Sequence, residues 1–338
     1  MRIAIDAMGG DNAPHVVVEG ALMAASEFGY DIVLVGDNAL IQNELFKKGA
    51  RMPKNISVCH ASEVIGMHEP AALSIRRKRD SSISVGAQLL KKGNVDAFVS
   101  AGNTGAVVCA ITLRMGLLEG VHRPGIAIIY PTLKDLCVLI DAGANIGPKP
   151  EHLMQYAIMG DVLQEHIFNK KDPRIGLLNV GEEDTKGTEF IKETHALLNA
   201  SPIRFSGNVE GGDIYTGDYD VVVCDGFVGN VVLKVSESLV HTLTTFLKRK
   251  LKQGIITQIG AFLSLPAYRS LMKEIDHSEH GGAPLLGVNG VCIIGHGSSS
   301  AKAIKNAVRE AAEFVSHKVN QHIVDNIREA SQHFSKKE

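Results

Sequence analysis

The chain has 338 residues, of which 45% are hydrophobic and 5% aromatic, and its formal net charge at pH 7 is −2. This composition excludes a disordered chain, and the near-neutral charge excludes a general attraction to nucleic acid. The five cysteines form no C-x-x-C pair, which favours reduced thiols over a disulfide framework or a zinc site. The first predicted strand leaves no room for a signal peptide, and no uncharged apolar run reaches about 18 residues. We therefore expect a cytoplasmic globular protein, long enough for one large α/β domain or two lobes around a cleft, and we predict a single α/β domain over residues 1–338.

Short apolar runs alternate with helical patterns along the chain, which is typical of an α/β fold with a mostly parallel sheet between two helical layers. Strands are predicted at residues 3–5, 32–35, 57–60, 95–99, 127–129, 138–140, 175–178, 203–205, 221–224 and 291–294. Helices are predicted at residues 14–28, 81–91, 104–117, 150–164, 188–198, 231–252 and 300–319, and the tail after residue 317 also has a helical pattern.

Five of these strands end at a cluster of Gly, Asn, Asp or Ser that precedes a helix. The clusters are residues 6–12, 100–105, 179–187, 225–230 and 295–300. Because the carboxyl ends of parallel strands share one edge of a sheet, we expect the five loops to form one ligand site there. Gly-rich loops before helices present free backbone N–H groups, so the expected ligand is an anion, above all phosphate.

Two of the loops match nucleotide-binding motifs only in part. Residues 181–188 place a Lys before a Gly, whereas a Walker A loop has the Lys after the Gly. Residues 295–300 carry Ser in place of the third Gly of a dinucleotide fingerprint, and no strand with an acidic tip follows. Orthophosphate, or the phosphates of a pantetheine carrier, therefore fit better than a nucleoside triphosphate or NAD.

The first two loops combine small residues with polar side chains. Asp6 and Asp11 flank a Gly pair that includes Gly10. Because carboxylates repel phosphate, we expect them to hold loops or to orient a neighbouring cation; the alternative is a tight turn in which Asp11 or Asn12 caps the next helix. Asn103 offers an amide N–H to a phosphate oxygen or an oxyanion at the start of a helix that begins with Thr104 and Gly105, and either Asn103 or Thr104 can cap this helix. Plain turn chemistry is the alternative for this loop.

The remaining loops hold the candidate reactive groups. Lys186 is the one cation in the five loops and would suit a phosphate, although a solvent-facing Lys beside acidic residues is equally compatible with the sequence. Asn230 follows Asp225 at the start of a helix, and the apolar neighbours of Cys224 predict an unreactive core thiol. An imidazole can gain or lose a proton near neutral pH, so His296 is a candidate general acid or base, or a donor to a backbone carbonyl.

Two further segments suggest interaction surfaces. A run of four basic residues suits docking of an acidic protein or a solvated surface: Arg76, Arg77, Lys78 and Arg79. Residues 254–268 carry no charge and are flanked by cations, so we expect residues 231–275 to form a projecting helical hairpin. Its apolar residues suit a dimer interface or a membrane surface: Ile255, Ile256, Phe262 and Leu263. Residues 277–287 are expected to form a loop.

Several motifs in the same order resemble the PlsX family of bacterial phosphate acyltransferases. They are Asp6-Ala7-Met8-Gly9-Gly10-Asp11, Ser100-Ala101-Gly102-Asn103-Thr104-Gly105-Ala106, Leu177-Leu178-Asn179-Val180-Gly181, Asp225-Gly226-Phe227-x-Gly229-Asn230 and His296-Gly297-Ser298-Ser299, with Asp141-x-Gly143-Ala144-Asn145 and Lys149-Pro150-Glu151-His152 between them. The resemblance runs from residue 1 to about residue 319. It implies an isocitrate/isopropylmalate-dehydrogenase-like fold without that enzyme's cofactor, shared with phosphotransacetylases.

The resemblance also implies the reaction, in which a long-chain acyl group moves from acyl carrier protein to orthophosphate and gives acyl phosphate for phospholipid synthesis. It implies a homodimer loosely associated with the membrane, with a membrane glycerol-3-phosphate acyltransferase as a further partner. No cofactor, metal or nucleic acid is implied. The roles it suggests are phosphate and oxyanion binding for Gly10, Asn103, Thr104, Gly105, Lys186 and Asn230, a place near the reacting centre for His296, and supporting positions for Asp6, Asp11 and Asp225.

Two alternatives stay open at this point. The first is a phosphotransacetylase-like enzyme for short acyl groups on coenzyme A, against which the uncharged stretch 254–268 argues, because a short acyl group needs no large apolar surface. The second is a non-catalytic ligand sensor on the same fold, against which the five complete loops argue.

Overall fold

An eleven-stranded sheet runs through the chain in the computed structural model, which describes residues 1–47, 53–274 and 281–335. Its strands are β1 (Arg2–Asp6), β2 (Asp31–Gly36), β3 (Ile56–His60), β4 (Ala97–Ser100), β5 (Gly125–Pro131), β6 (Leu136–Ile140), β7 (Ile175–Leu178), β8 (Phe205–Val209), β9 (Val221–Val223), β10 (Ala283–Leu286) and β11 (Val291–Ile294). Their order across the sheet is β3-β2-β1-β4-β11-β10-β5-β6-β9-β7-β8.

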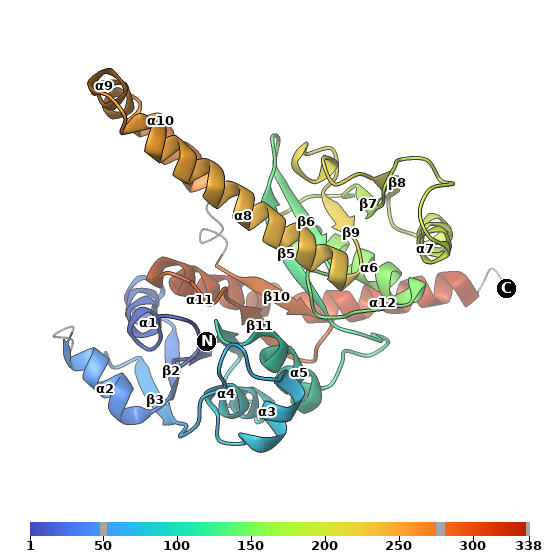
Figure 1. Cartoon of the computed structure of the whole chain (residues 1–338). Coiled ribbons are helices and arrows are strands. Elements are labelled where there is room, and N and C mark those ends of the chain that lie inside the picture. The colour runs from blue at the N-terminus through green and yellow to red at the C-terminus, as the bar shows by residue number, and fades with distance from the viewer. Residues whose placement is uncertain (48–52, 275–280, 336–338) are drawn as a thin grey trace.

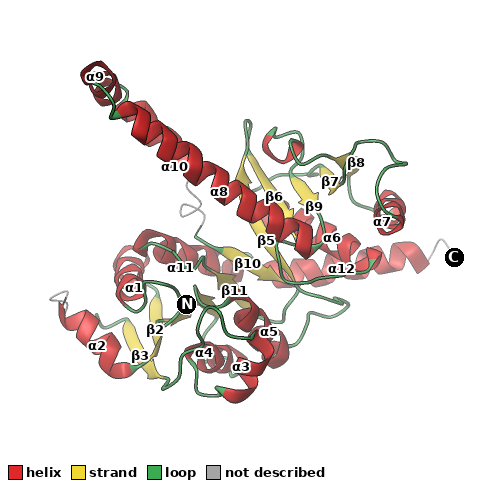
Figure 2. Ribbon diagram, viewed as in Figure 1, coloured by secondary structure: helices red, strands yellow, loops and turns green. Residues whose placement is uncertain are grey.

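Helices cover both faces of this sheet, which gives the three layers that the sequence predicts (Figures 1 and 2). They are α1 (His15–Phe28), α2 (Asn38–Lys47), α3 (Ala71–Arg77), α4 (Ser82–Lys91), α5 (Thr104–Met115), α6 (Pro150–His166), α7 (Glu189–Ala200), α8 (Gly226–Leu251), α9 (Ile255–Leu263), α10 (Leu265–Glu274), α11 (Ala301–Ser316) and α12 (Val319–Ser335). A 3₁₀ turn, η1, spans Asp213–Tyr215.

Alternation along β1 shows how the layers are built. Ile3 and Ile5 pack among residues of α1 and α11, whereas Ala4, between them, packs among residues of α4 and α5. Successive side chains of a strand point to opposite faces, so a strand that is apolar throughout is buried on both sides. The prediction that the aliphatic runs form strands of a sheet between two helical layers is therefore confirmed.

Strand directions correct one expectation about the loops. β10 is antiparallel to both of its neighbours, β11 and β5, and β5 is antiparallel to β6. The second half of the sheet (β6, β9, β7 and β8) therefore runs opposite to the first half (β1 to β4 and β11). The expectation that all five loops share one edge is wrong, because the carboxyl ends of the two halves point in opposite directions.

The sequence also missed several elements. β10 lies within residues 277–287, which were expected to form a loop; residues 275–280 lie outside the described residues. Its side chains are buried throughout, so it shows no alternation of apolar and polar residues. The strand expected at residues 203–205 begins at Phe205 instead, and α2 and α3 were not predicted.

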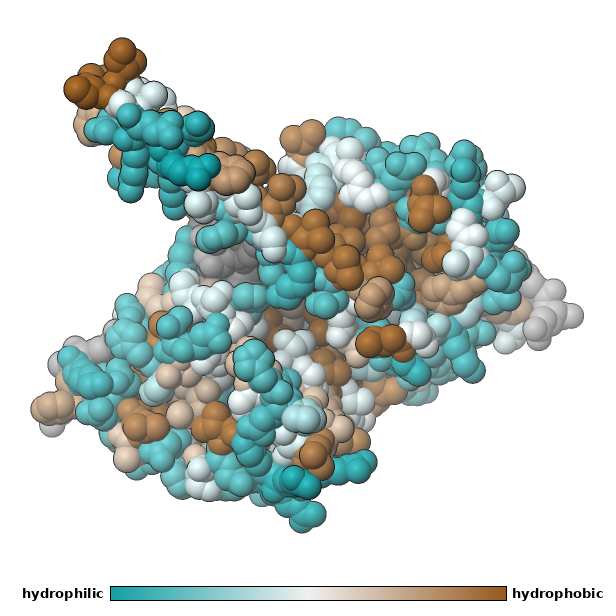
Figure 3. All heavy atoms as spheres, in the orientation of Figure 1, coloured by the Kyte–Doolittle hydropathy of each residue, from teal (hydrophilic) through white to brown (hydrophobic). Residues whose placement is uncertain are grey.

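The projecting hairpin expected at residues 231–275 is present as an arm formed by α8, α9 and α10. The arm extends away from the body with α9 at its tip, and Figure 3 shows hydrophobic side chains at this tip (Figures 1 and 3). No residue of α9 is buried, and Ile256 and Phe262 are 86% and 76% exposed. Among the described residues, no helix is both long enough and apolar enough to cross a membrane.

Candidate active site

Three of the predicted loops meet at the carboxyl ends of β1, β4 and β11. The backbone N–H of Asp11 donates to the carbonyl of Gly297 at 2.8 Å, and the N–H of Gly295 donates to the carbonyl of Ser100 at 2.8 Å. A small cavity lies between these loops, lined in part by Gly10, Ala101 and Gly297. The first half of the sheet therefore brings the loops at residues 6–12, 100–105 and 295–300 into direct contact.

Gly10 shows why this junction needs small residues. Its φ of +103° lies in the region that side-chain-bearing residues rarely adopt, and a Cβ atom there would lie 2.9 Å from the carbonyl oxygen of Gly297. The two loops could not approach as closely with any other residue at this position.

Asp6 holds two of these loops together. Its carboxylate is buried and accepts hydrogen bonds from the hydroxyl of Ser100 at 2.7 Å and from the N–H of Met8 at 3.1 Å. Burial raises the pKa of Asp6, against the opposing effect of these hydrogen bonds. Asp11 is exposed, and its backbone N–H contacts the loop at residues 295–300. No side chain caps α1, so the capping alternative for Asp11 is wrong.

Asn103 is the N-cap of α5, and its amide is engaged within the chain. Its Oδ1 accepts from the N–H of Ala106 at 3.0 Å, and its Nδ2 lies 3.2, 3.0 and 3.0 Å from the carbonyl oxygens of Gly66, Met67 and Glu69. This corrects the expectation that the side chain is free to donate to an oxyanion. Thr104 and Gly105 remain exposed in the first turn of α5, where backbone N–H groups have no partner within the helix.

A second group of loops meets at the carboxyl ends of β6 and β9. Asp141 follows β6, is buried, and accepts at Oδ1 from the N–H groups of Ile126, Gly143 and Ala144 at 3.0, 3.0 and 2.9 Å. Asp225 caps α8 by accepting from the N–H of Phe227 at 2.9 Å. Sequence reasoning quoted the Asp141 motif without a role, although an acidic residue after an apolar run was the available signal.

The remaining predicted residues of this half are Asn230, Cys224 and Lys186. Asn230 is exposed in the first turns of α8, and a Cβ on Gly143 would lie 3.4 Å from its Cβ. Cys224 is buried, so the expected core position is confirmed, and burial raises the pKa of its thiol. The side chain of Lys186 is 53% exposed, and its Nζ lies 4.0 Å from Glu183. This is the solvent-facing alternative that the sequence left open.

His296 connects the two groups of loops through α8. Its Nε2 lies 3.2 Å from Lys234 Nζ and 3.7 Å from Glu237, while its Nδ1 lies 2.7 Å from the hydroxyl of Ser298. α8 begins beside Asp141 in the second half and reaches the β11 loop of the first half within its third turn. The sequence does not indicate Lys234 and Glu237 as site residues, because they lie inside α8, beyond the predicted loop at residues 225–230.

The basic run lies beside the Asn103 loop. Arg76, Arg77 and Arg79 are exposed, but Lys78 pairs with Glu69 at 2.6 Å and donates to the carbonyl of Val64 at 2.7 Å. The hydrogen bond from Lys78, with those from Gly66 and Ser74, lowers the pKa of Glu69 to about 2. Lys78 is therefore a structural residue, and only the three arginines face outward.

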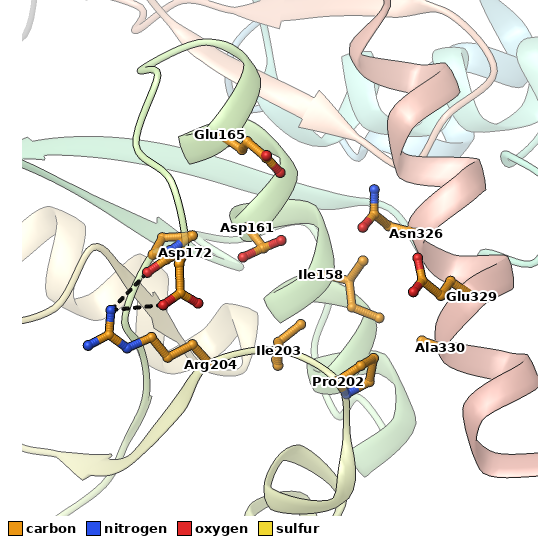
Figure 4. A pocket seen from close by; sticks show the side chains of 11 residues that line it. Ile158, Asp161, Glu165, Asp172, Pro202, Ile203, Arg204, Asn326, Glu329 and Ala330 are labelled. Carbon is orange, nitrogen blue, oxygen red and sulfur yellow. Dashed lines mark hydrogen bonds and ion pairs between the residues drawn. The ribbon is translucent and has the colours of Figure 1, made fainter.

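A larger pocket of about 170 Å³ lies elsewhere, between α6, α12 and the segments that precede β7 and β8 (Figure 4). Four carboxylates line it, from Asp161, Glu165, Asp172 and Glu329. Burial and the neighbouring acids raise the pKa of Asp161 to about 6. No residue of the five loops lines this pocket, and its negative charge repels phosphate. Among the described residues, no group of three or more potential metal ligands is found.

Solved structures with the same fold are phosphotransacetylases and a related dehydrogenase. A phosphotransacetylase from Streptococcus pyogenes aligns with a TM-score of 0.62 and 17% identity, covering 94% of each chain. A 4-hydroxythreonine-4-phosphate dehydrogenase from Klebsiella pneumoniae aligns with a TM-score of 0.53 and 14% identity, covering 93% of this chain and 99% of that one. These likenesses show the fold alone.

Sequence relatives are much closer. A phosphate acyltransferase from Geotalea daltonii is 48% identical over 97% of this chain and 95% of its own length. A phosphate acyltransferase from Heliobacterium modesticaldum is 50% identical over 93% of this chain and 94% of its own length. A family described as "Fatty acid synthesis protein" matches residues 1–322, and the chain belongs to this family.

Proposed function

We propose that this chain is a phosphate acyltransferase, which moves an acyl group from a thioester to orthophosphate in lipid synthesis. Its family is described as fatty acid synthesis protein, and relatives about half identical over nearly the whole chain are named phosphate acyltransferase. The structural observation that carries the proposal is the junction of three Gly-rich loops, one of which contains His296. Gly-rich loops that precede helices offer backbone N–H groups to an anion.

In the proposed reaction, phosphate is itself the nucleophile. An oxygen of HPO₄²⁻ forms a bond to the thioester carbonyl carbon, and the carbonyl π electrons move to oxygen to give a tetrahedral oxyanion. When the carbonyl re-forms, the C–S bond breaks and the thiolate leaves with its electron pair. The phosphate proton passes to this thiolate. Because a free thiol has a pKa of about 8.5, the thiolate is a good leaving group and needs little assistance to leave. The products are an acyl phosphate dianion and a thiol.

The chain contributes positioning and charge stabilisation to this reaction. We assign phosphate and oxyanion contacts to the backbone around Gly10, Thr104 and Gly105, and the relay of the proton to His296. Asn230, exposed at the start of α8, is assigned to the substrate from the other half of the sheet. We assign Asp6, Asp141 and Asp225 to holding the loops in place. Their carboxylates accept hydrogen bonds from the Ser100 hydroxyl, the Gly143 N–H and the Phe227 N–H, respectively.

The donor is proposed to be a long-chain acyl group on acyl carrier protein. Arg76, Arg77 and Arg79 form an exposed basic patch on α3 and the turn after it, and Asn103 links the residues before α3 to the candidate site. An acidic carrier protein would be attracted to this patch, with affinity that falls as salt rises. The acyl thioester would then lie close to the loop junction.

The arm is proposed to pair with its copy in a homodimer and to touch the membrane at its tip. Val235, Leu239 and Leu243 expose apolar side chains at four-residue spacing along α8, with 61%, 55% and 58% exposure. At the tip, Ile255, Ile256, Phe262 and Leu263 are all exposed, and Lys248, Arg249 and Lys250 precede them. This arrangement supports a cytoplasmic protein that associates loosely with anionic lipid and delivers its product to a membrane glycerol-3-phosphate acyltransferase.

The test compares palmitoyl-acyl carrier protein with acetyl-coenzyme A as donors, with and without phosphate, while thiol release and acyl phosphate are measured. We expect phosphate-dependent release from the first donor at a much higher kcat/KM. Preference for acetyl-coenzyme A would support the short-chain phosphotransacetylase alternative, which shares the fold. Absence of phosphate-dependent release from both donors would reject the enzyme proposal and favour a ligand sensor.

The arm is tested separately with Ile256→Glu/Phe262→Glu. Both side chains are largely exposed, so the body should fold normally and keep its activity on soluble donor, while binding to anionic lipid vesicles should be lost. Conversion to inactive monomers would place these side chains in a dimer interface and reject the membrane contact.

A further inference from the structure

A cation lies directly beside His296, and it comes from the arm helix α8 and not from a loop. Lys234 Nζ lies 3.2 Å from His296 Nε2 and 2.9 Å from Glu237 Oε2. The Lys234 and His296 side chains are 54% and 53% exposed, so the cluster is open to solvent and can be reached by a small anion. Assuming the proposed function, we infer that Lys234 provides the positive charge that binds the phosphate substrate beside His296.

The His296 ring is oriented toward this lysine. The hydroxyl and the backbone N–H of Ser298 lie 2.7 and 3.3 Å from Nδ1, which fixes that edge of the ring against its own loop. Nε2 is therefore the atom directed at α8. A phosphate that contacts Lys234 at this place would also contact the ring atom that relays its proton.

Glu237 is the partner of Lys234 when no phosphate is bound. It follows Lys234 by one helical turn and pairs with it, so the charge of Lys234 is balanced in the free protein. A phosphate dianion carries more charge and offers more acceptor oxygens than one carboxylate, so it competes with Glu237 for the ammonium group. Glu237 therefore opposes phosphate binding and sets its strength.

The position of α8 explains why a lysine in a helix can serve loops of the other half of the sheet. Asp225 caps α8 in the second half, and the hydroxyl of Tyr215 in η1 hydrogen-bonds to Ser236, next to Glu237. These contacts hold α8 to the second half while Lys234 reaches the first. Phosphate at Lys234 and His296 would thus lie between the two halves.

Lys186 is the competing candidate. Its side chain has nearly the same exposure, 53%, but its loop contains three consecutive acids, Glu182, Glu183 and Asp184, and its Nζ faces Glu183. Acidic neighbours lower the local concentration of an anion. The surroundings of the two lysines, rather than their exposure, favour Lys234.

The test measures binding of inorganic phosphate by calorimetry and the KM for phosphate in thiol release. Lys234→Ala should raise both constants by at least about tenfold, because a hydrogen bond to a charged group is lost. Lys234→Arg should restore most of the affinity, which a purely packing role would not predict. Glu237→Gln should bind phosphate more tightly than wild type. Lys91→Ala, at an exposed position at the end of α4 and outside the proposed sites, is the control and should leave both constants unchanged.

The outcomes separate this inference from the proposed function. If wild-type protein shows phosphate-dependent thiol release but Lys234→Ala keeps the wild-type phosphate constants, Lys234 is not the binding group. A larger effect of Lys186→Ala than of Lys234→Ala would assign the charge to Lys186 instead. If Lys234→Ala fails to fold, Glu237→Gln decides, since unchanged or weaker phosphate binding in that variant contradicts competition between Glu237 and phosphate. If wild type itself releases no thiol with phosphate, the proposed function fails.

Discussion

Asp6 and Asp141 occupy equivalent places in the two halves of the sheet but are used differently. Each lies at the carboxyl end of a strand and is almost completely buried, and burial raises the pKa of both. Asp141 accepts from the N–H groups of Gly143, Ala144 and Asn145 in its own loop and from Ile126 in the neighbouring strand. Asp6 accepts from Ser100, and so ties the end of β1 to the end of β4.

The comparison shows two ways of building a binding loop. Asp141 accepts mainly from its own loop, with one further bond from β5, so its main effect is to stabilise that loop. Asp6 accepts from Met8 in its own loop and from Ser100, and the second bond sets the distance between loops that we assign to the substrate. A carboxylate in a Gly-rich loop therefore need not contact a ligand, because buried backbone N–H groups require acceptors of their own.

The largest expected effect is that of Asp141→Ala on stability. It removes the acceptor of at least four backbone N–H groups, and each buried group left without a partner costs about 1–3 kcal/mol. We expect a loss of at least about 3 kcal/mol in the free energy of unfolding, measured by urea denaturation. Asp141→Asn keeps one acceptor oxygen and should lose less. A loss below about 1 kcal/mol for Asp141→Ala would mean that water replaces the carboxylate.

Asp6→Ala should cost less stability, about 2 kcal/mol, because fewer donors lose their acceptor. For a given loss of stability, Asp6→Ala should lose more activity than Asp141→Ala, because the ends of β1 and β4 are no longer held together. Measurement of kcat and of the unfolding free energy in the same preparation separates the two effects. If Asp6→Ala and Asp141→Ala lose activity only in step with their stability, the distinction between joining loops and stiffening one loop is wrong.

A matched pair of glycines sharpens the comparison further. Gly10 and Gly143 both have positive φ, +103° and +130°, so an added side chain strains the backbone at either position. A Cβ at Gly10 would meet the carbonyl oxygen of Gly297 at 2.9 Å, whereas at Gly143 the closest atom would be 3.4 Å away. Gly10→Ala should therefore lower the melting temperature more than Gly143→Ala. Equal shifts would mean that backbone strain alone limits both positions.

The sequence was sufficient for the parts of the fold that have a local signal. Aliphatic runs such as Ile3–Ile5 lie on both faces of a strand, so they were recognised without knowledge of their neighbours. The Gly and Asp clusters also marked the strand ends correctly. β10 was missed because a short, fully buried segment that contains Pro284 has no alternation. The two antiparallel pairings of β10 cancel, so the opposite directions of the two halves come from the antiparallel pair β5 and β6.

The candidate site was predictable as a set of loops but not as a set of roles. The sequence places Asn103 at a helix start, yet its three carbonyl neighbours come from residues more than 30 positions away. The sequence favours Lys186 as the phosphate-binding cation because it lies in a strand-end loop. Lys234 lies within a helix and reaches His296 only because α8 crosses from one half of the sheet to the other. Contacts between distant segments decided both cases, and no local pattern records them.

The smallest expected effect on stability is that of Glu69, whose pKa is lowered, whereas the pKa values of Asp6 and Asp141 are raised. Its carboxylate is partly exposed, and hydrogen bonds from Lys78, Gly66 and Ser74 lower its pKa from 4.5 to about 2. A carboxyl group with a lowered folded-state pKa stabilises the fold above its unfolded pKa, and this contribution is lost as the pH falls toward the folded pKa. Glu69→Gln should therefore be less stable than wild type at pH 7, with a difference that narrows as the pH falls below about 4.5. Urea denaturation at several pH values checks this, with Glu63→Gln as a nearby control. A difference that stays constant with pH would show that Glu69 acts through neutral hydrogen bonds, not through its charge.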